Sequence, residues 1–76
     1  MEPWIPEIPT FRRAQGKKDG KERLYLLANN EADIDAMLKA AGLMSAGIHR
    51  QDDKHFNGYY RIIKKWEEPI IKKVFP

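Results

Sequence analysis

Residues 22–42 read ERLYLLANNEADIDAMLKAAG, an apolar run followed by an amphipathic one. The run from Leu24 to Leu27 holds only leucine and tyrosine, so both faces of an extended chain would be apolar there. Short apolar runs of this kind are typical of strands that are covered on both faces. The sequence therefore predicts a strand over 22–28 in the middle of a sheet.

The second part of this stretch carries the start and stop signals of a helix. Asn30 stands where an N-cap is expected, and the carboxylate of Asp33 can reach back to it. Apolar residues from Ile34 onward recur at i, i+3, i+4 and i+7, which gives one buried face. Gly42 stands where a left-handed residue commonly ends a helix. We therefore expect a helix over 31–41.

Further strands are expected on both sides of this unit. We expect a short strand over 11–15, and Asp19-Gly20 predicts a hairpin turn between it and the strand over 22–28. Residues 44–50 alternate between apolar and polar side chains, as a half-buried strand does. The apolar residues of 59–66 are all β-branched or aromatic, which favours a strand, expected over 59–65, although their spacing also suits a helix. Asn57-Gly58 just before them predicts a hairpin turn.

These elements follow one another in the order ββαββ, and Pro69 opens a possible short C-terminal helix. The order predicts an α+β fold, with a small antiparallel sheet and one main helix packed on it. Residues 1–10 contain three prolines and are expected to form an extended arm in front of a single domain over 11–76.

A helix-turn-helix is the competing fold. In that interpretation residues 45–54 form a second helix and Asn57-Gly58 forms a wing. Gly47 inside that helix would cost about 1 kcal/mol relative to alanine. Asp52 and Asp53 would also bring negative charge close to DNA phosphates.

Length and composition exclude several classes of protein. A chain of 76 residues allows one small domain, and the absence of cysteine excludes disulfide scaffolds, iron–sulfur clusters and thiolate zinc sites. No apolar run approaches the ~20 residues of a membrane-spanning helix, and the N-terminus lacks the apolar core of a signal peptide. We therefore expect a cytoplasmic protein that has no membrane partner.

The net charge of +3 is unevenly distributed. Residues 11–23 hold six basic and two acidic side chains, a local charge of +4, and residues 54–76 hold the same numbers. Residues 28–53 between them hold two basic and five acidic side chains, a local charge of −3. Such a separation of basic and acidic segments indicates what kind of partner the protein binds more than which fold it has.

Two basic hairpins that converge in space would make a surface for nucleic acid. Phosphates need several cations, and unpaired bases need flat aromatic faces. The predicted phosphate contacts are Arg12, Arg13, Lys17, Lys18, Arg61, Lys64 and Lys65, with Tyr59 and Tyr60 as stacking residues and Tyr25 and Phe56 as further aromatic candidates. The function predicted from these residues is that of a non-catalytic accessory or regulatory protein that binds DNA, RNA or a nucleoprotein complex. We expect no metal, no cofactor and no small-molecule substrate, because no motif for one is present.

The alternative is a protein–protein interaction module. Trp4, Ile5 and Ile8 in the proline-rich arm, together with the apolar residues of the C-terminus, would then bind a second copy or another protein. A metal site or an RNA-cleaving site around His49 and His55 is a weaker hypothesis, because these residues lack a recognised spacing.

Overall fold

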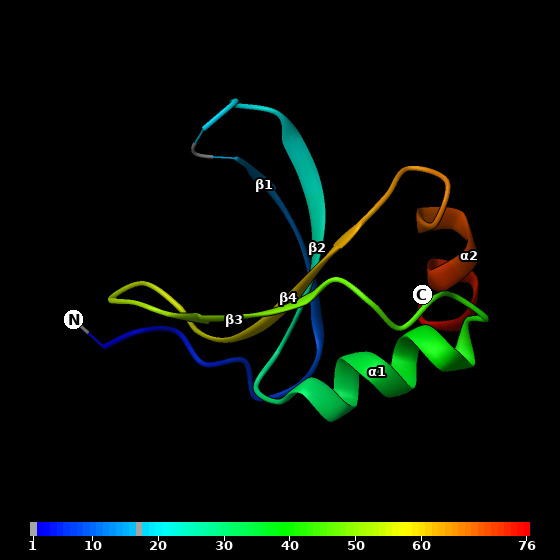
Figure 1. Cartoon of the computed structure of the whole chain (residues 1–76), viewed down its shortest axis with the longest axis horizontal. Coiled ribbons are helices and arrows are strands. Elements are labelled where there is room, and N and C mark those ends of the chain that lie inside the picture. The colour runs from blue at the N-terminus through cyan, green and yellow to red at the C-terminus, as the bar shows by residue number, and fades with distance from the viewer. Residues whose placement is uncertain (1, 17) are drawn as a thin grey trace.

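Four strands form one antiparallel sheet in the computed structural model of the chain, which describes residues 2–16 and 18–76 (Figure 1). They lie side by side in the order β1 (Thr10–Gln15), β2 (Glu22–Ala28), β4 (Asn57–Ile63) and β3 (Ile48–Asp52). Helix α1 (Glu31–Ala40) connects β2 to β3, and the short helix α2 (Glu68–Val74) follows β4. The predicted α+β class, with its antiparallel sheet, main helix and short C-terminal helix, is confirmed.

Strand β2 is central, as its apolar sequence predicts. Leu24, Leu26 and Ala28 alternate along β2 and point to the face that α1 covers. Tyr25 and Leu27 point to the other face, because successive side chains of a strand lie on opposite sides. The apolar residues of β2 therefore contribute both to the core under α1 and to the opposite face of the sheet.

Helix α1 begins as the sequence indicates. The side-chain oxygen of Asn30 accepts a hydrogen bond from the backbone N–H of Asp33 at 2.9 Å, which satisfies one of the free donors of the first turn. Asn30 also donates to the Asp33 carboxylate at 3.1 Å. The helix ends where Gly42 takes the left-handed conformation, with φ of 71°.

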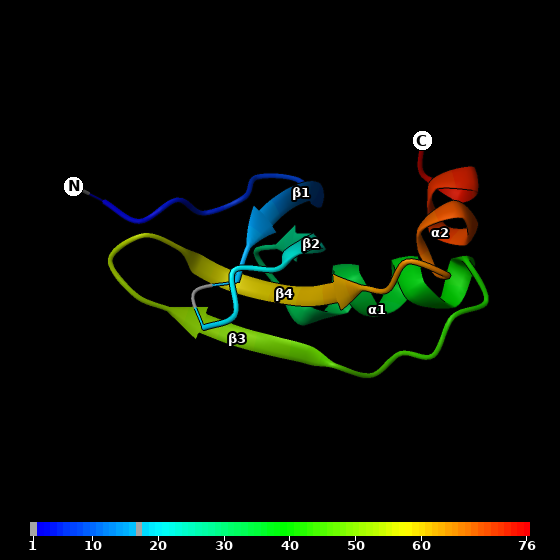
Figure 2. The same ribbon diagram turned by 90° about the horizontal axis from the view of Figure 1, so that it is seen from above.

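The hydrophobic core lies between the sheet and the two helices. Ile34 and Leu38 of α1 pack on β2 and β4, and Ile71 of α2 joins them from the end of the sheet. Figure 2 shows α2 beside the last turns of α1, so that both helices serve the same side of the molecule. The opposite face of the sheet has no helix on it among the described residues.

The strand expected over 44–50 is only partly correct. Residues 43–47 are irregular and β3 starts at Ile48. Gly47 has a φ of 74°, which lies outside the extended conformation of a regular strand, and the carbonyl groups of Met44 and Ala46 accept hydrogen bonds from Arg61. The same segment shows that the helix-turn-helix alternative is wrong, because no helix covers residues 45–54.

The turn expected at Asn57-Gly58 is also wrong, because both residues belong to β4. Asp53 makes the turn instead, since its Oδ1 accepts hydrogen bonds from the backbone N–H groups of His55 and Phe56 at 2.8 and 2.9 Å. Gly58 is required for a different reason. A Cβ at this position would lie 2.6 Å from the backbone oxygen of Ala28.

Neither helix has the length and apolar character needed to cross a bilayer, as far as the described residues go.

Candidate functional site

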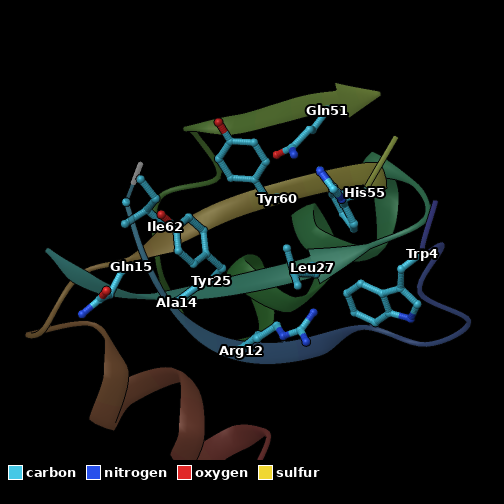
Figure 3. A pocket seen from close by; sticks show the side chains of 12 residues that line it. Trp4, Arg12, Ala14, Gln15, Tyr25, Leu27, Gln51, His55, Tyr60 and Ile62 are labelled. Carbon is cyan, nitrogen blue, oxygen red and sulfur yellow. The ribbon is translucent and has the colours of Figure 1, made fainter. Parts of the chain in front are cut away.

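The face of the sheet opposite α1 carries an aromatic and apolar surface, which we call the open face (Figure 3). It comprises alternate side chains of the four strands together with Trp4 and two residues of the β3–β4 connection. Its residues are Trp4, Arg12, Ala14, Tyr25, Leu27, His49, Gln51, His55, Phe56, Tyr60 and Ile62. In Figure 3 the labelled side chains stand on the near side of the sheet, and α1 lies behind it.

Strand register arranges these side chains in two rows. Arg12 of β1 is paired with Tyr25 of β2, which is paired with Ile62 of β4. In the neighbouring row Tyr60 of β4 stands between Leu27 on β2 and His49 on β3. The ring centroids of Tyr25 and Tyr60 are 5.9 Å apart in an edge-to-face arrangement, and those of His49 and Tyr60 are 5.3 Å apart. Three aromatic rings from three strands are therefore in contact across both register rows, and we call these rings the aromatic row.

A hollow of about 400 Å³ lies in the open face. Trp4 and Phe56 flank it at one side, with ring centroids 5.7 Å apart, and the two tyrosines flank it at the other. Leu27 is 8% exposed and lies between these pairs. Its charged or titratable lining consists of Arg12, His55 and the tyrosines, and no carboxylate of the described residues lines it. The hollow is therefore apolar and aromatic, with a positive rim.

Arg12 differs from every other arginine of the chain. Four arginines are paired with carboxylates, namely Arg13 with Glu68, Arg23 with Asp19, Arg50 with Asp52 and Arg61 with Glu67. Within residues 2–16 and 18–76, Arg12 has no carboxylate partner, and its guanidinium lies 5.3 Å from the centroid of the Trp4 ring. It is exposed at the edge of the hollow. A guanidinium in this position is free to bind an anion.

The neighbouring cation on this face is neutralised. Arg23 donates to both carboxylate oxygens of Asp19, at 3.1 and 2.6 Å. These hydrogen bonds lower the pKa of Asp19 to about 2 and raise the pKa of Arg23, so the pair stays ionised at neutral pH. Arg23 is thus bound to a carboxylate of the same chain, whereas Arg12 has no such partner among the described residues.

The arm reaches the open face through Trp4. The backbone of Trp4 donates to His55 O and accepts from Asn57 N, each at 3.0 Å, in a parallel bridge beside the start of β4. Pro6 is fully buried, whereas Ile5 and Ile8 are 52% and 72% exposed. Of the three predicted partner-binding residues, Trp4 is therefore partly used by the protein itself and the two isoleucines face solvent.

The position of Arg61 argues against its predicted contact with phosphate. Its side chain is buried, and its five N–H groups match five acceptors. It donates to Ala46 O, Met44 O, Ile62 O and both carboxylate oxygens of Glu67, at 2.5–3.0 Å. Arg61 therefore holds the loop after α1 to the start of α2, and no donor is left for a ligand.

The remaining predicted residues do not form one patch. Arg13 and Tyr59 lie on the helix-bearing face, where Arg13 contacts Glu68 and Tyr59 packs against the core under Arg50. Their neighbours Arg12 and Tyr60 lie on the open face. Lys18 is exposed at the β1–β2 turn, Lys64 and Lys65 are exposed beyond the end of β4, and Lys17 lies outside the described residues.

The two basic segments converge only in part, which corrects the expectation from the charge pattern. Antiparallel pairing places Ile63 beside Leu24 and Tyr59 beside Ala28. The β1–β2 turn is therefore at the Leu24 end of the sheet, and the β3–β4 turn is at the Ala28 end. Lys54 in the β3–β4 turn therefore lies at the opposite end of the sheet from the β1–β2 turn. Lys64 and Lys65, in contrast, follow Ile63 at the Leu24 end, where the β1–β2 turn also lies.

Sequence reasoning missed the open face as a unit. Gln51, His55 and Ile62 line it but were not grouped with Arg12 and Tyr60. The alternation of side chains in β2 and β4 assigns the residues of each strand to its two faces. The sequence does not indicate which strands are neighbours in the sheet, so it does not show which residues share one face.

No cluster of three or more potential metal ligands exists among the described residues. No protein-family model matches the chain, and no curated protein or solved structure is significantly similar to it. Function is therefore inferred from the geometry of the open face.

Proposed function

We propose that the protein binds nucleic acid through the open face of its sheet, as a small accessory or regulatory protein without catalytic activity. The supporting observation is Arg12, a guanidinium without a carboxylate partner among the described residues, beside a hollow that no described acidic residue lines. Guanidinium groups bind phosphate oxygens in a bidentate manner, and aromatic faces accept bases. The proposal thus rests on one sheet face and no longer on converging hairpins.

The charge of the open face favours a nucleic acid over a second copy of the chain. If two open faces packed together, each Arg12 would be removed from water against a hollow without a described carboxylate, and Asp19 and Asp53 near it already accept hydrogen bonds from Arg23 and Gln51. An unpaired buried charge costs several kcal/mol, which offsets much of the gain from burying the aromatic rings. A phosphate-bearing ligand supplies the missing negative charge, whether it comes from DNA, RNA or a nucleoprotein complex.

Arg12 and Arg13 provide a matched test, because they are adjacent and lie on opposite faces. The variant Arg12→Gln is expected to bind a fluorescent oligonucleotide about tenfold more weakly, through loss of a charge-assisted hydrogen bond. The variant Arg13→Gln loses the same charge and is expected to bind like the wild type. Fluorescence anisotropy in a salt series measures both.

Equal losses in the two variants would mean that only overall charge matters, which contradicts a site on the open face. Absence of binding by the wild-type protein at low ionic strength contradicts nucleic-acid binding altogether.

A second candidate function is protein docking through the exposed ends of the chain. Ile5 and Ile8 are exposed in the arm, and Trp66, Ile70 and Val74 are 40–61% exposed around α2. Apolar side chains of this size on a small domain mark interaction surfaces when they are contiguous. If the partner is a second copy, light scattering gives a dimer mass that Ile5→Ser/Ile8→Ser reduces. A monomer mass for the wild type at all concentrations excludes self-association.

A further inference from the structure

We infer that the open face takes unpaired bases, so that its ligand is single-stranded nucleic acid; this inference rests on the proposed function and specifies its substrate class. The first observation is the aromatic row. Tyr25 and Tyr60 meet at an interplanar angle of 69°, and His49 lies against Tyr60 at 34°. Rings from three strands thus form a platform on an otherwise uncovered sheet.

The hollow adds a place for a planar group beside this row. It lies between the Trp4–Phe56 pair and the two tyrosines, with Leu27 between them (Figure 3). In a duplex the flat faces of the bases are covered by their neighbours, and only their edges reach the grooves. An aromatic hollow can therefore be filled by a base only when that base is unstacked.

The scarcity of unpaired cations on the open face indicates the same ligand. Proteins that depend on duplex phosphates make several contacts, about 6–10 in strongly salt-dependent cases. The open face has one arginine without a described acidic partner, since Asp19 engages Arg23. The one phosphate contact of Arg12 contributes about tenfold to affinity, whereas each base stacked on an aromatic side chain strengthens binding about five- to a hundredfold and the face offers more than one ring. Stacking is therefore the larger contribution available here.

The rim of the hollow offers groups that could contact a base edge. His55 and Gln51 lie on one side of it, and Arg12 lies on the other. The side-chain N–H of Gln51 donates to Asp53 at 2.8 Å, which fixes the orientation of the amide. A base seated on the rings would thus have polar groups at its edge and a guanidinium near its phosphate.

The test compares one sequence of about 12 nucleotides as single-stranded RNA, single-stranded DNA and duplex DNA, with the full chain at low salt. We expect the wild type to bind at least one of the single strands about tenfold more tightly than the duplex. The variant Tyr60→Leu is expected to lose about tenfold on single strands and little on duplex. The variant Tyr60→Phe keeps the ring and is expected to keep binding.

Trp66→Leu is both control and reporter. Trp66 is 61% exposed and outside the hollow, so its replacement is expected to leave affinity unchanged. Trp4 is then the one remaining tryptophan, and a base stacked in the hollow is expected to quench its fluorescence. This readout does not depend on whether Tyr60→Leu folds.

The outcomes separate this inference from the proposed function. Duplex binding equal to or tighter than binding of both single strands, or unquenched Trp4 at saturation, contradicts single-strand recognition and leaves nucleic-acid binding intact. No binding of any of the three oligonucleotides contradicts both.

Discussion

Arg61 and Glu67 form the most deeply buried ion pair of the described residues, with side chains 8% and 3% exposed. Every N–H of the guanidinium has an acceptor, and one Glu67 oxygen also accepts from the backbone N–H of Lys64 at 3.0 Å. Such a pair adds little when compared with an apolar replacement of both partners. Removal of one partner, however, leaves the other charge uncompensated.

The variant Arg61→Met is therefore expected to lower the free energy of unfolding by about 3–5 kcal/mol. Arg13→Met is the matched control, since it breaks the more exposed pair with Glu68 and is expected to cost about 0–1 kcal/mol. Urea denaturation measures both values. Similar small losses in the two variants would contradict the structural role assigned to Arg61.

Glu67 predicts how stability depends on pH. The hydrogen bonds from Arg61 are the main cause that lowers the pKa of Glu67 below its ordinary value of 4.5. A carboxylate with a lowered folded-state pKa stabilises the fold above its unfolded-state pKa. This contribution is lost as the pH falls through the lower, folded-state value.

We therefore expect the free energy of unfolding to decrease as the pH falls below 4.5, and the variant Glu67→Gln to lack that part of the decrease. Denaturation between about pH 7 and pH 3 checks this. Glu68→Gln makes the same chemical change at the next residue and should keep the acid dependence that Glu67 causes. An identical pH profile for Glu67→Gln and wild type would contradict the pairing.

At the scale of elements, the β3–β4 connection depends on Asp53 and not on Asn57-Gly58. Asp53→Ala is expected to cost about 1–2 kcal/mol, because its Oδ1 accepts two backbone hydrogen bonds in the turn. Asn57→Ala is expected to change stability by less than about 0.5 kcal/mol, because Asn57 is the first residue of β4 and the turn hydrogen bonds are made by Asp53. Thermal unfolding of the two variants checks the difference, and the reverse order of stability would contradict this turn.

The accuracy of the sequence prediction varies with how local the determining interaction is. The bounds of β2 and the N-cap of α1 follow from adjacent residues, and both are confirmed. The segment 44–47 was predicted wrongly because a distant side chain, Arg61, binds its carbonyl groups. Asn57-Gly58 resembles a turn dipeptide, but close packing of Gly58 against Ala28 decides its place. Non-local contacts of this kind leave no local pattern.

The same distinction applies to the candidate site. Arg12 and Tyr60 were predicted individually from residue type. Their neighbours Arg13 and Tyr59 were predicted for the same surface, although strand alternation sends them to the opposite face. Which residues share a face across strands depends on the order β1-β2-β4-β3, and that order is set by pairing between distant segments.

At the scale of the whole molecule, charge pairing explains why a single arginine, Arg12, is available to an anion although the net charge is +3. Ion pairs with Asp19, Asp52, Glu67 and Glu68 engage four of the five arginines. One face of the sheet is covered by helices, and the other keeps aromatic rings and Arg12. The proposed function therefore depends on the difference between these two faces.

Methyl NMR tests this difference most directly, because β2 and β4 each present adjacent residues to opposite faces. Leu27 and Ile62 lie on the open face, while their neighbours Leu26 and Ile63 are in the core, 0% and 4% exposed. On titration with a single-stranded oligonucleotide, the methyl signals of Leu27 and Ile62 are expected to shift, and those of Leu26 and Ile63 to stay in place. Shifts confined to the core pair, or no shift in either pair, would contradict binding on the open face.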